Sequence, residues 1–213
     1  IGSFSKEAYE FVDFLESAGQ SYWQVLPLSP TGYGDSPYQS FSAFAGNPYL
    51  IDLDTLCVQN LLRQEEIEAY PWGGDPERVD YGALFDSRTK LLGLATKRFF
   101  EEPPADFAGF LEENQFWLPD YALFMALKDR FGGENWRNWE EEIRLRTPEA
   151  LAKWREALEC EIRLQYFIQY VFRQQWDALH TYAAEKKIKI IGDVPIYVPL
   201  DSADVWANPE LFQ

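Results

Sequence analysis

The chain has 213 residues, of which 46% are hydrophobic and 17% aromatic. This content supports a folded core and excludes a disordered chain, which would be poorer in apolar residues. Acidic residues outnumber basic residues by 35 to 19, and the resulting net charge of −16 argues against nucleic acid and membrane surfaces as partners while leaving neutral ligands open.

The cysteine and hydropathy patterns favour a reducing, aqueous compartment. Cys57 and Cys160 are the only cysteines in the sequence, too few for a disulfide framework or a metal-ligand cluster. The longest strongly apolar run, Tyr121 to Leu127, is too short to cross a bilayer. No signal peptide is evident, but the sequence starts at Ile1 rather than methionine and we expect further sequence upstream. We therefore expect a cytoplasmic protein without metal or cofactor.

The first predicted element is a helix over residues 5–18, because apolar residues recur there at helical spacing. Ser5 is a candidate N-cap, and Gly19 is a typical C-terminal stop. The β-favouring run from Tyr22 to Leu26, bounded by Pro27, then predicts a short buried strand.

The segment from Ser29 to Ser42 combines Gly and Pro with aromatic, hydroxyl and amide side chains. Tyr33 and Tyr38 could stack on the apolar face of a sugar, and Asp35, Ser36 and Gln39 could hydrogen-bond its hydroxyl groups. Binding loops of α/β folds follow strands in this way. The alternative is an ordinary surface loop of turn residues.

The chain from residue 49 to 187 is predicted to be mainly helical after a short extended piece at Tyr49–Leu53. Its residue pattern predicts helices near 54–69, 81–101, 105–113, 120–131 and 148–187, the last of them broken. His180, the only histidine, is interpreted as a helix-surface residue. The tryptophans are interpreted as packing residues rather than a ligand platform; they are Trp136, Trp139, Trp154 and Trp176.

A second strand is predicted at residues 187–193, directly after the long helix, as in a parallel α/β unit. Asp193 at its carboxyl end would point to the same side as the loop after the first strand, although a turn or cap role is the alternative. Asp201-Ser202 is a candidate helix cap. Two strands cannot close a barrel or bury a parallel sheet on both faces, so we expect a part of a larger fold.

These segments together resemble a known family. Tyr22-Trp-Gln-Val-Leu-Pro-Leu followed by Pro30-Thr-Gly-Tyr-Gly-Asp-Ser-Pro-Tyr-Gln-Ser-Phe-Ser-Ala-Phe-Ala-Gly-Asn-Pro48 is similar to the signature of the amylomaltases, the 4-α-glucanotransferases of glycoside hydrolase family 77. Ile191-Gly-Asp-Val-Pro-Ile-Tyr-Val198 and Asp201-Ser-Ala-Asp-Val-Trp206 resemble that family's next signature, in the same order. The resemblance covers the whole chain.

The resemblance implies an α/β fold, a fragment of a (β/α)8 TIM-type barrel with a large helical insertion. Residues 1–53 would form the first part of the barrel with the substrate loop, 54–187 the helical insertion, and 188–213 the next barrel strand and loop. The family moves segments of α-1,4-glucan between malto-oligosaccharides by retaining chemistry on a carboxylate pair. Those carboxylates would lie beyond Gln213 and the first barrel strand before Ile1, so this chain would contain no catalytic residue and would be inactive alone.

Two substrate contacts carry over from the resemblance. Tyr38 matches the tyrosine that lines the glucosyl subsite at the cleavage point, and Asp193 matches the substrate-contacting aspartate after the third barrel strand. Tyr33 matches a secondary glucan contact. Tyr197 and Val198 stand where the wider α-amylase clan often has Asn-His, which argues against an ordinary amylase.

Two other interpretations remain open at this level. The chain could be a non-catalytic carbohydrate-binding or scaffold protein that uses part of this fold, or a helical interaction protein whose tyrosine-rich loop is incidental. A fragment of a barrel would leave apolar strand and helix faces uncovered, and such faces favour self-association. The expected partners are α-1,4-glucans and malto-oligosaccharides, with no nucleic acid and no membrane.

Overall fold

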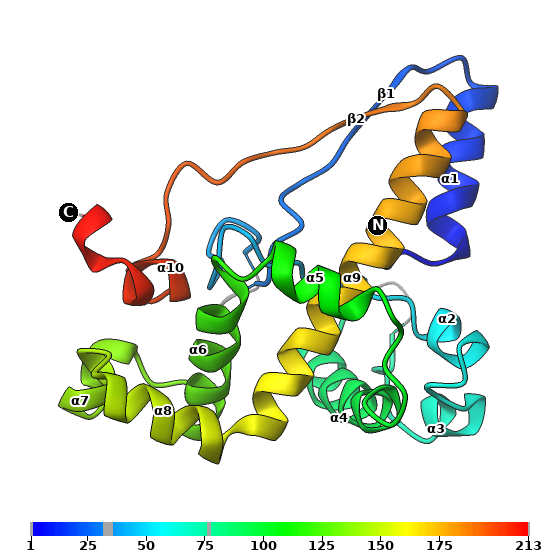
Figure 1. Ribbon diagram of the computed structural model, residues 1–213. Coiled ribbons are helices and arrows are strands. Elements are labelled where there is room, and N and C mark those ends of the chain that lie inside the picture. Colours follow the sequence, from blue (N-terminus) through cyan, green and yellow to red (C-terminus); the bar gives the residue numbers. More distant parts are fainter. Residues whose placement is uncertain (1, 32–35, 76–77, 213) are drawn as a thin grey trace. The chain divides into compact units, whose positions relative to one another are not determined.

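The structure is a computed structural model that describes residues 2–31, 36–75 and 78–212 (Figure 1). Its described part is mostly helical, with one small parallel sheet. The elements in chain order are α1 Lys6–Ser17, β1 Tyr22–Gln24, a 3-10 turn Pro48–Leu50, α2 Leu53–Val58, α3 Gln64–Glu68, α4 Tyr81–Phe99, α5 Phe107–Glu113, α6 Leu118–Arg130, a 3-10 turn Trp136–Asn138, α7 Glu141–Arg144, α8 Pro148–Ala157, α9 Glu159–Glu185, β2 Lys189–Ile191, α10 Ala203–Ala207 and a 3-10 turn Pro209–Leu211.

The chain divides into two compact units, each made of three separate stretches. Unit 1 comprises residues 1–28, 47–104 and 168–194, and unit 2 comprises residues 29–46, 105–167 and 195–213. The residues of α9 are shared between the two.

Helix α1 begins and ends near the predicted positions. Ser5 occupies the N-cap, but its hydroxyl donates to Glu7 Oε2 at 2.5 Å instead of capping the backbone. Gly19 adopts a φ of 68°, and the amide of Gln20 donates to Leu15 O at 2.9 Å. This left-handed glycine with its backward hydrogen bond is the Schellman stop that the sequence predicts.

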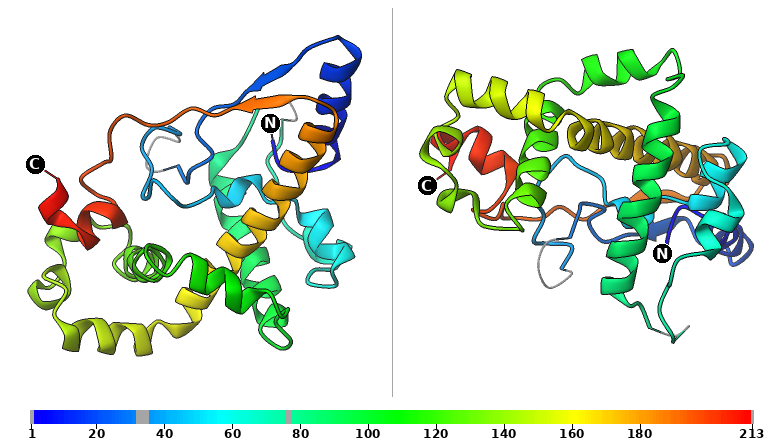
Figure 2. Two further views of the ribbon diagram at one scale, coloured as in Figure 1. Left: turned by 45° about the horizontal axis from the view of Figure 1, so that its top comes forward. Right: turned by 90° about the horizontal axis from the view of Figure 1, so that it is seen from below.

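The two strands pair in parallel, as the sequence predicts. Trp23 lies opposite Ile190, and Val25 N donates to Ile191 O at 2.9 Å. Figure 2 shows β1 and β2 side by side. The core of unit 1 forms where α1, the strands and the end of α9 meet; its buried residues are Phe4, Ala8, Val12, Leu15, Trp23, Val25, Leu179, Ala183 and Ile188. Trp176 packs against this core, which confirms its predicted packing role.

Unit 2 is built on α6, whose buried residues contact side chains from α7, α8, α9 and α10. Phe124 lies at the centre, with its ring centroid 5.4 Å from Trp139 and 5.9 Å from Trp206. Trp136 and Trp154 pack against the same core, which confirms the packing role predicted for these tryptophans.

Three local predictions are wrong. β1 is not a buried strand, because Trp23 is the one buried residue of its three. Tyr49–Leu53 is not extended, because Pro48–Leu50 forms a 3-10 turn and Asp52 caps α2 by accepting from Thr55 N at 2.9 Å. The helix predicted over 54–69 is two helices, α2 and α3. They separate at Asn60, which has a φ of 60° and ends α2 in the same way that Gly19 ends α1.

Candidate functional site

The predicted substrate loop turns at Ser36–Gln39. Gln39 N donates to Ser36 O at 3.2 Å, and the amide of Tyr38 lies 3.4 Å from Ser36 Oγ. This turn presents Tyr38 outward with 46% of its surface exposed. An exposed tyrosine ring offers both an aromatic face and a hydroxyl group to a polyhydroxylated ligand. Tyr33 and Asp35, the other two predicted contacts in this loop, lie outside the described residues.

Buried serines shape the chain after Tyr38. The Ser40 hydroxyl donates to Ser42 O at 2.7 Å, and Ser42 Oγ accepts from Phe44 N at 3.1 Å. Local bonds of this kind give the backbone an alternative to helix or sheet. In this loop, serine hydroxyl groups therefore supply hydrogen bonds that a helix or sheet would otherwise give the backbone.

Helix α10 holds this loop through its first residues. Ala203 N donates to Phe41 O at 2.8 Å, and Ala43 N donates to Asp204 Oδ2 at 2.8 Å. Burial raises the pKa of the Asp204 carboxyl, and hydrogen bonds from the Ala43 amide and the Ser42 hydroxyl oppose that rise. These bonds join segments about 160 residues apart in sequence.

The start of α10 is itself anchored. Ser202 caps the helix by accepting from Val205 N at 3.3 Å, as its sequence position suggests. Asp201 pairs with Lys128 of α6 at 2.8 Å, and its other oxygen accepts from Trp136 N at 3.3 Å. The Lys128 side chain is only 7% exposed, and its ammonium group also donates to Gly133 O at 2.7 Å and to Glu134 O at 2.9 Å. All three of its protons therefore have acceptors.

Asp193 follows β2 by two residues and belongs to unit 1. It is half-buried and lines a cavity of about 300 Å³ together with Leu26, Trp176 and His180. His180 is exposed, and its ring lies 5.9 Å from that of Trp176. The position of Asp193 directly beyond a parallel strand is the one predicted from the sequence.

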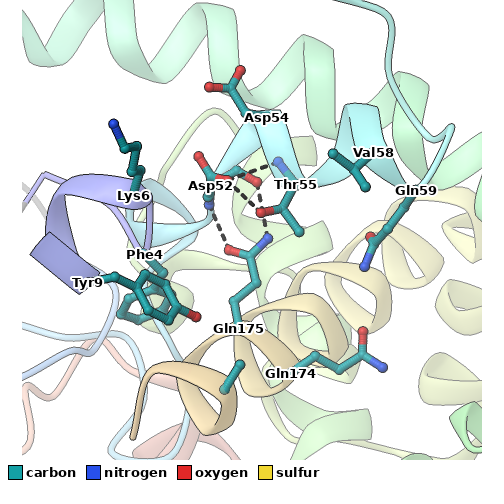
Figure 3. Close-up of a pocket in the computed structure, with 11 residues that line it drawn as sticks. Phe4, Lys6, Tyr9, Asp52, Asp54, Thr55, Val58, Gln59, Gln174 and Gln175 are labelled. Carbon is teal, nitrogen blue, oxygen red and sulfur yellow. Dashed lines mark hydrogen bonds between the residues drawn. The ribbon is translucent and has the colours of Figure 1, made fainter. Parts of the chain in front are cut away.

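A larger cavity of unit 1, about 530 Å³, lies between α1, α2 and α9 (Figure 3). Gln175 fixes its wall, because its amide accepts from Asp52 N at 2.7 Å and donates to Asp52 O at 3.0 Å. Tyr9 forms the opposite side, and burial raises the pKa of its hydroxyl. Asp193 does not line this cavity, so the predicted site residue and this hollow of unit 1 are separate features.

The structure brings Ser36 and Tyr38 together in one turn of unit 2 and places Asp193 in unit 1. Sequence reasoning missed the residues that hold the turn, which are Lys128, Asp201 and Asp204. Asp201 carried a signal as a candidate helix cap, and Asp204 appeared only as part of a family signature. Within the described ranges no group of three or more His, Cys, Asp and Glu is arranged to hold a metal ion, and no helix is long and apolar enough to span a membrane.

Comparison with known proteins gives one consistent result. The family model for 4-alpha-glucanotransferase matches residues 1–213. The 4-alpha-glucanotransferase of Clostridium butyricum is 50% identical over 212 residues, and that of Thermus thermophilus is 49% identical over 216 residues. Each alignment covers 100% of this chain but only 44% and 42% of the relative, so the chain spans less than half the length of these curated relatives.

Solved structures agree with the sequence comparison. The structure described as amylomaltase from Streptococcus agalactiae in complex with acarbose matches with a TM-score of 0.95 and 46% identity, covering 100% of this chain and 43% of that one. Amylomaltase from Corynebacterium glutamicum shares the fold, with a TM-score of 0.72 at 16% identity over 98% of this chain and 30% of that chain. The full-length family match, the two signatures and the shared fold together establish that the chain belongs to the 4-α-glucanotransferases of glycoside hydrolase family 77.

Proposed function

We propose that the intact protein is a 4-α-glucanotransferase that moves α-1,4-glucan segments between malto-oligosaccharides, and that this chain supplies part of its glucan-binding surface. The observation that carries the proposal is the match of the whole chain, at a TM-score of 0.95, to an amylomaltase solved with acarbose. A neutral glucan also suits a chain of net charge −16, which would repel an anionic substrate.

In this proposal the chain contributes two strands of a (β/α)8 barrel. Residues 1–53 and 188–213 belong to the barrel and its loops, and residues 54–187 form the helical insertion. Tyr38 stacks on the glucosyl unit at the cleavage point, Asp193 accepts hydrogen bonds from sugar hydroxyl groups, and the Ser36 hydroxyl forms a further hydrogen bond with them. Tyr33 and Asp35 add further contacts to the glucan. The two unpaired cysteines, Cys57 and the exposed Cys160, suit a cytoplasmic location.

The reaction itself follows the retaining scheme. A carboxylate attacks the anomeric carbon while a second carboxyl group protonates the departing glycosidic oxygen. That second group then takes the proton of the acceptor's 4-hydroxyl, whose oxygen attacks the anomeric carbon and displaces the first carboxylate. We assign both carboxyl groups to sequence outside this chain. The chain's own residues bind the glucan and orient it, and they do not take part in the bond changes.

Disproportionation of maltotriose tests the proposal. The intact protein should release glucose and longer malto-oligosaccharides, whereas residues 1–213 alone should give no turnover above a matched blank. Turnover by the short chain would show that catalytic carboxyl groups lie within it. An intact protein that binds glucans without turnover would favour the non-catalytic carbohydrate-binding alternative.

Substitutions in the intact protein test the residue assignments. Asp193→Asn should lower kcat/KM by one to two powers of ten, because a hydrogen bond to a charged group contributes about 1.5–3 kcal/mol. Tyr38→Ala should cost more than Tyr38→Phe, because only the former removes the aromatic face. Wild-type kinetics for both Asp193→Asn and Tyr38→Ala would show that these residues do not contact the substrate.

A further inference from the structure

We propose that Asp204 is a positioning residue that sets the shape of the Tyr38 turn, and that the Asp201–Lys128 pair fixes the helix that carries it. The inference rests on the proposed function, because it assigns Asp204 a role in presenting Tyr38 to a glucan. Asp204 itself need not touch the glucan.

The first observation is the pair of bonds between α10 and the loop. Asp204 Oδ2 accepts from Ala43 N at 2.8 Å, and Ala203 N donates to Phe41 O at 2.8 Å. The loop therefore meets α10 through both a side chain and the backbone, on either side of the buried Ser42. Two bonds separated by one residue fix the direction of the loop as well as its position.

The second observation is the local connection from this anchor back to Tyr38. Ser42 N donates to Ser40 Oγ at 3.2 Å, and Ser40 Oγ donates to Ser42 O at 2.7 Å. Ser40 is buried and lies two residues after Tyr38. A shift of the backbone at Ala43 is therefore passed through Ser42 and Ser40 to the turn that displays Tyr38.

The third observation is the rigidity of the anchor. Asp201 is held by the Lys128 ammonium group at 2.8 Å and by Trp136 N at 3.3 Å. Trp136 Nε1 also donates to Leu200 O at 2.7 Å. The Lys128 nitrogen lies 5.4 Å from the centre of the Phe41 ring, so the same lysine contacts the loop. Functional side chains are best positioned when the residues that support them have fixed partners of their own.

Burial gives a reason for a carboxylate at position 204. Most of the Asp204 side chain is removed from water, which costs free energy unless strong partners compensate. A small apolar residue would fill the same space without this cost, so fold stability alone does not favour the charge. The carboxylate instead supplies a strong acceptor for the loop amide, which points to control of loop geometry.

The test compares three substitutions at Asp204 in the intact protein. Asp204→Leu has the same branching and no acceptor but is larger, and Asp204→Asn has the same size and keeps one acceptor oxygen. Asp204→Ser, whose side chain is too short to reach Ala43, replaces the leucine variant if that variant does not fold. Amide hydrogen exchange at residues 38–44 and maltotriose kinetics are measured for each. The leucine variant should exchange faster by about tenfold or more at Ala43 and at Tyr38 and Gln39, whereas the asparagine variant should stay close to the parent.

The kinetic prediction is coupled to Tyr38. Asp204→Leu should lower kcat/KM by about tenfold in the parent, because the altered turn no longer presents the Tyr38 ring. In a Tyr38→Ala background, which has no ring to present, the loss should be less than about twofold. Asp201→Asn should act in the same direction with a smaller effect. Faster exchange confined to Ala43, equal kinetic losses for the leucine and asparagine variants, or additive losses with Tyr38→Ala would each overturn the inference. A parent without transferase activity would refute the proposed function, and the exchange measurement alone would then decide the role of Asp204.

Discussion

The segment around Tyr38 carries predicted glucan contacts and the segment at residues 194–200 directly follows another, Asp193, but the chain supports the two segments differently. Residues 36–46 bury Ser40, Ser42 and Ala45, and α10 holds their backbone. In residues 194–200, by contrast, Ile196 is 89% exposed and Tyr197 is 82% exposed. The first segment finds its partners within the described part of the chain, whereas the second presents large apolar side chains to solvent. A site can therefore be preorganised on one segment and depend on additional contacts on another.

The largest expected effect is the difference in stability between truncating a buried residue of α10 and truncating an exposed residue of 194–200. Trp206→Ala should destabilise the protein by about 3–5 kcal/mol, because it removes a buried ring and leaves a cavity. Trp206 is 1% exposed, packs against Phe124 and Trp139, and lies 4.3 Å from the Arg146 guanidinium carbon. The measurement is the free energy of unfolding from urea titration.

Ile196→Ala is the matched control for Trp206→Ala. Because Ile196 is almost fully exposed, its truncation should change the free energy of unfolding by less than about 0.5 kcal/mol. Similar losses for the two variants would contradict the contrast between the helix that holds the Tyr38 segment and residues 194–200.

The second prediction concerns association of the 213-residue chain. Exposed apolar side chains in one stretch tend to find partners, so we expect the purified chain to self-associate. Replacing Ile196 by Asp should lower the average mass in light scattering at equal concentration, whereas replacing the exposed Glu112 by Asp should not. A stable monomer of the unsubstituted chain with a cooperative thermal transition would contradict this expectation.

The third prediction uses two carboxyl groups with opposite pKa shifts. Hydrogen bonding to the Arg98 guanidinium lowers the pKa of Glu66 from 4.5 to about 2, whereas burial raises the pKa of Asp204 above 3.8. The stabilisation from Glu66 is therefore complete above pH 4.5 and is lost as the pH falls towards 2. Asp204 keeps its proton to a higher pH in the folded chain than in the unfolded chain. Its contribution to the free energy of unfolding therefore falls as the pH rises above 3.8.

Urea midpoints measured across the acidic range check both signs. Relative to the parent, Glu66→Gln should lose stability as the pH rises from about 2 to 4.5, and Asp204→Asn should gain relative stability as the pH rises above 3.8. The same sign for both variants would show that the two environments do not differ as the structure indicates.

The smallest effect is expected at His180. Its ring is exposed on α9 and lies beside Trp176, so His180→Ala should change the free energy of unfolding by less than about 0.5 kcal/mol. Its kinetics on maltotriose in the intact protein should equal those of the parent. A tenfold loss of kcat/KM would place His180 in the glucan site with Asp193, whose cavity it lines.

The sequence predicts the elements well where the signal is local. Helical spacing with Gly19 defines α1, and the order of helix and strand predicts the parallel pairing of β1 with β2. The division between α2 and α3 could also have been predicted, because Asn60 is one of the few residues that tolerate the left-handed conformation that ends a helix.

The support of the Tyr38 turn could not be predicted in the same way. Lys128 and Asp201 are 73 residues apart, and Ala43 and Asp204 are 161 residues apart. Asp201 stands out in the sequence as a candidate cap and Asp204 as part of a family signature, but neither signal indicates a partner so far away in a chain of 35 acidic residues. The site residues were identified from loop composition and from their positions after strands, and the family signatures then supported them; their contact with glucan stays a prediction.

Each unit consists of three separate stretches of the chain, and this arrangement affects when the protein can fold during its synthesis on the ribosome. Helix α1 packs on the end of α9, where Lys186 contacts Glu16 at 2.8 Å across 170 residues of sequence (Figure 1). At a synthesis rate of about 5–20 residues per second, α1 waits roughly 10 to 35 s for that partner to emerge. Neither unit can be completed by an uninterrupted stretch of nascent chain, so each unit is completed only late in synthesis, and the apolar face of α1 stays uncovered during that interval.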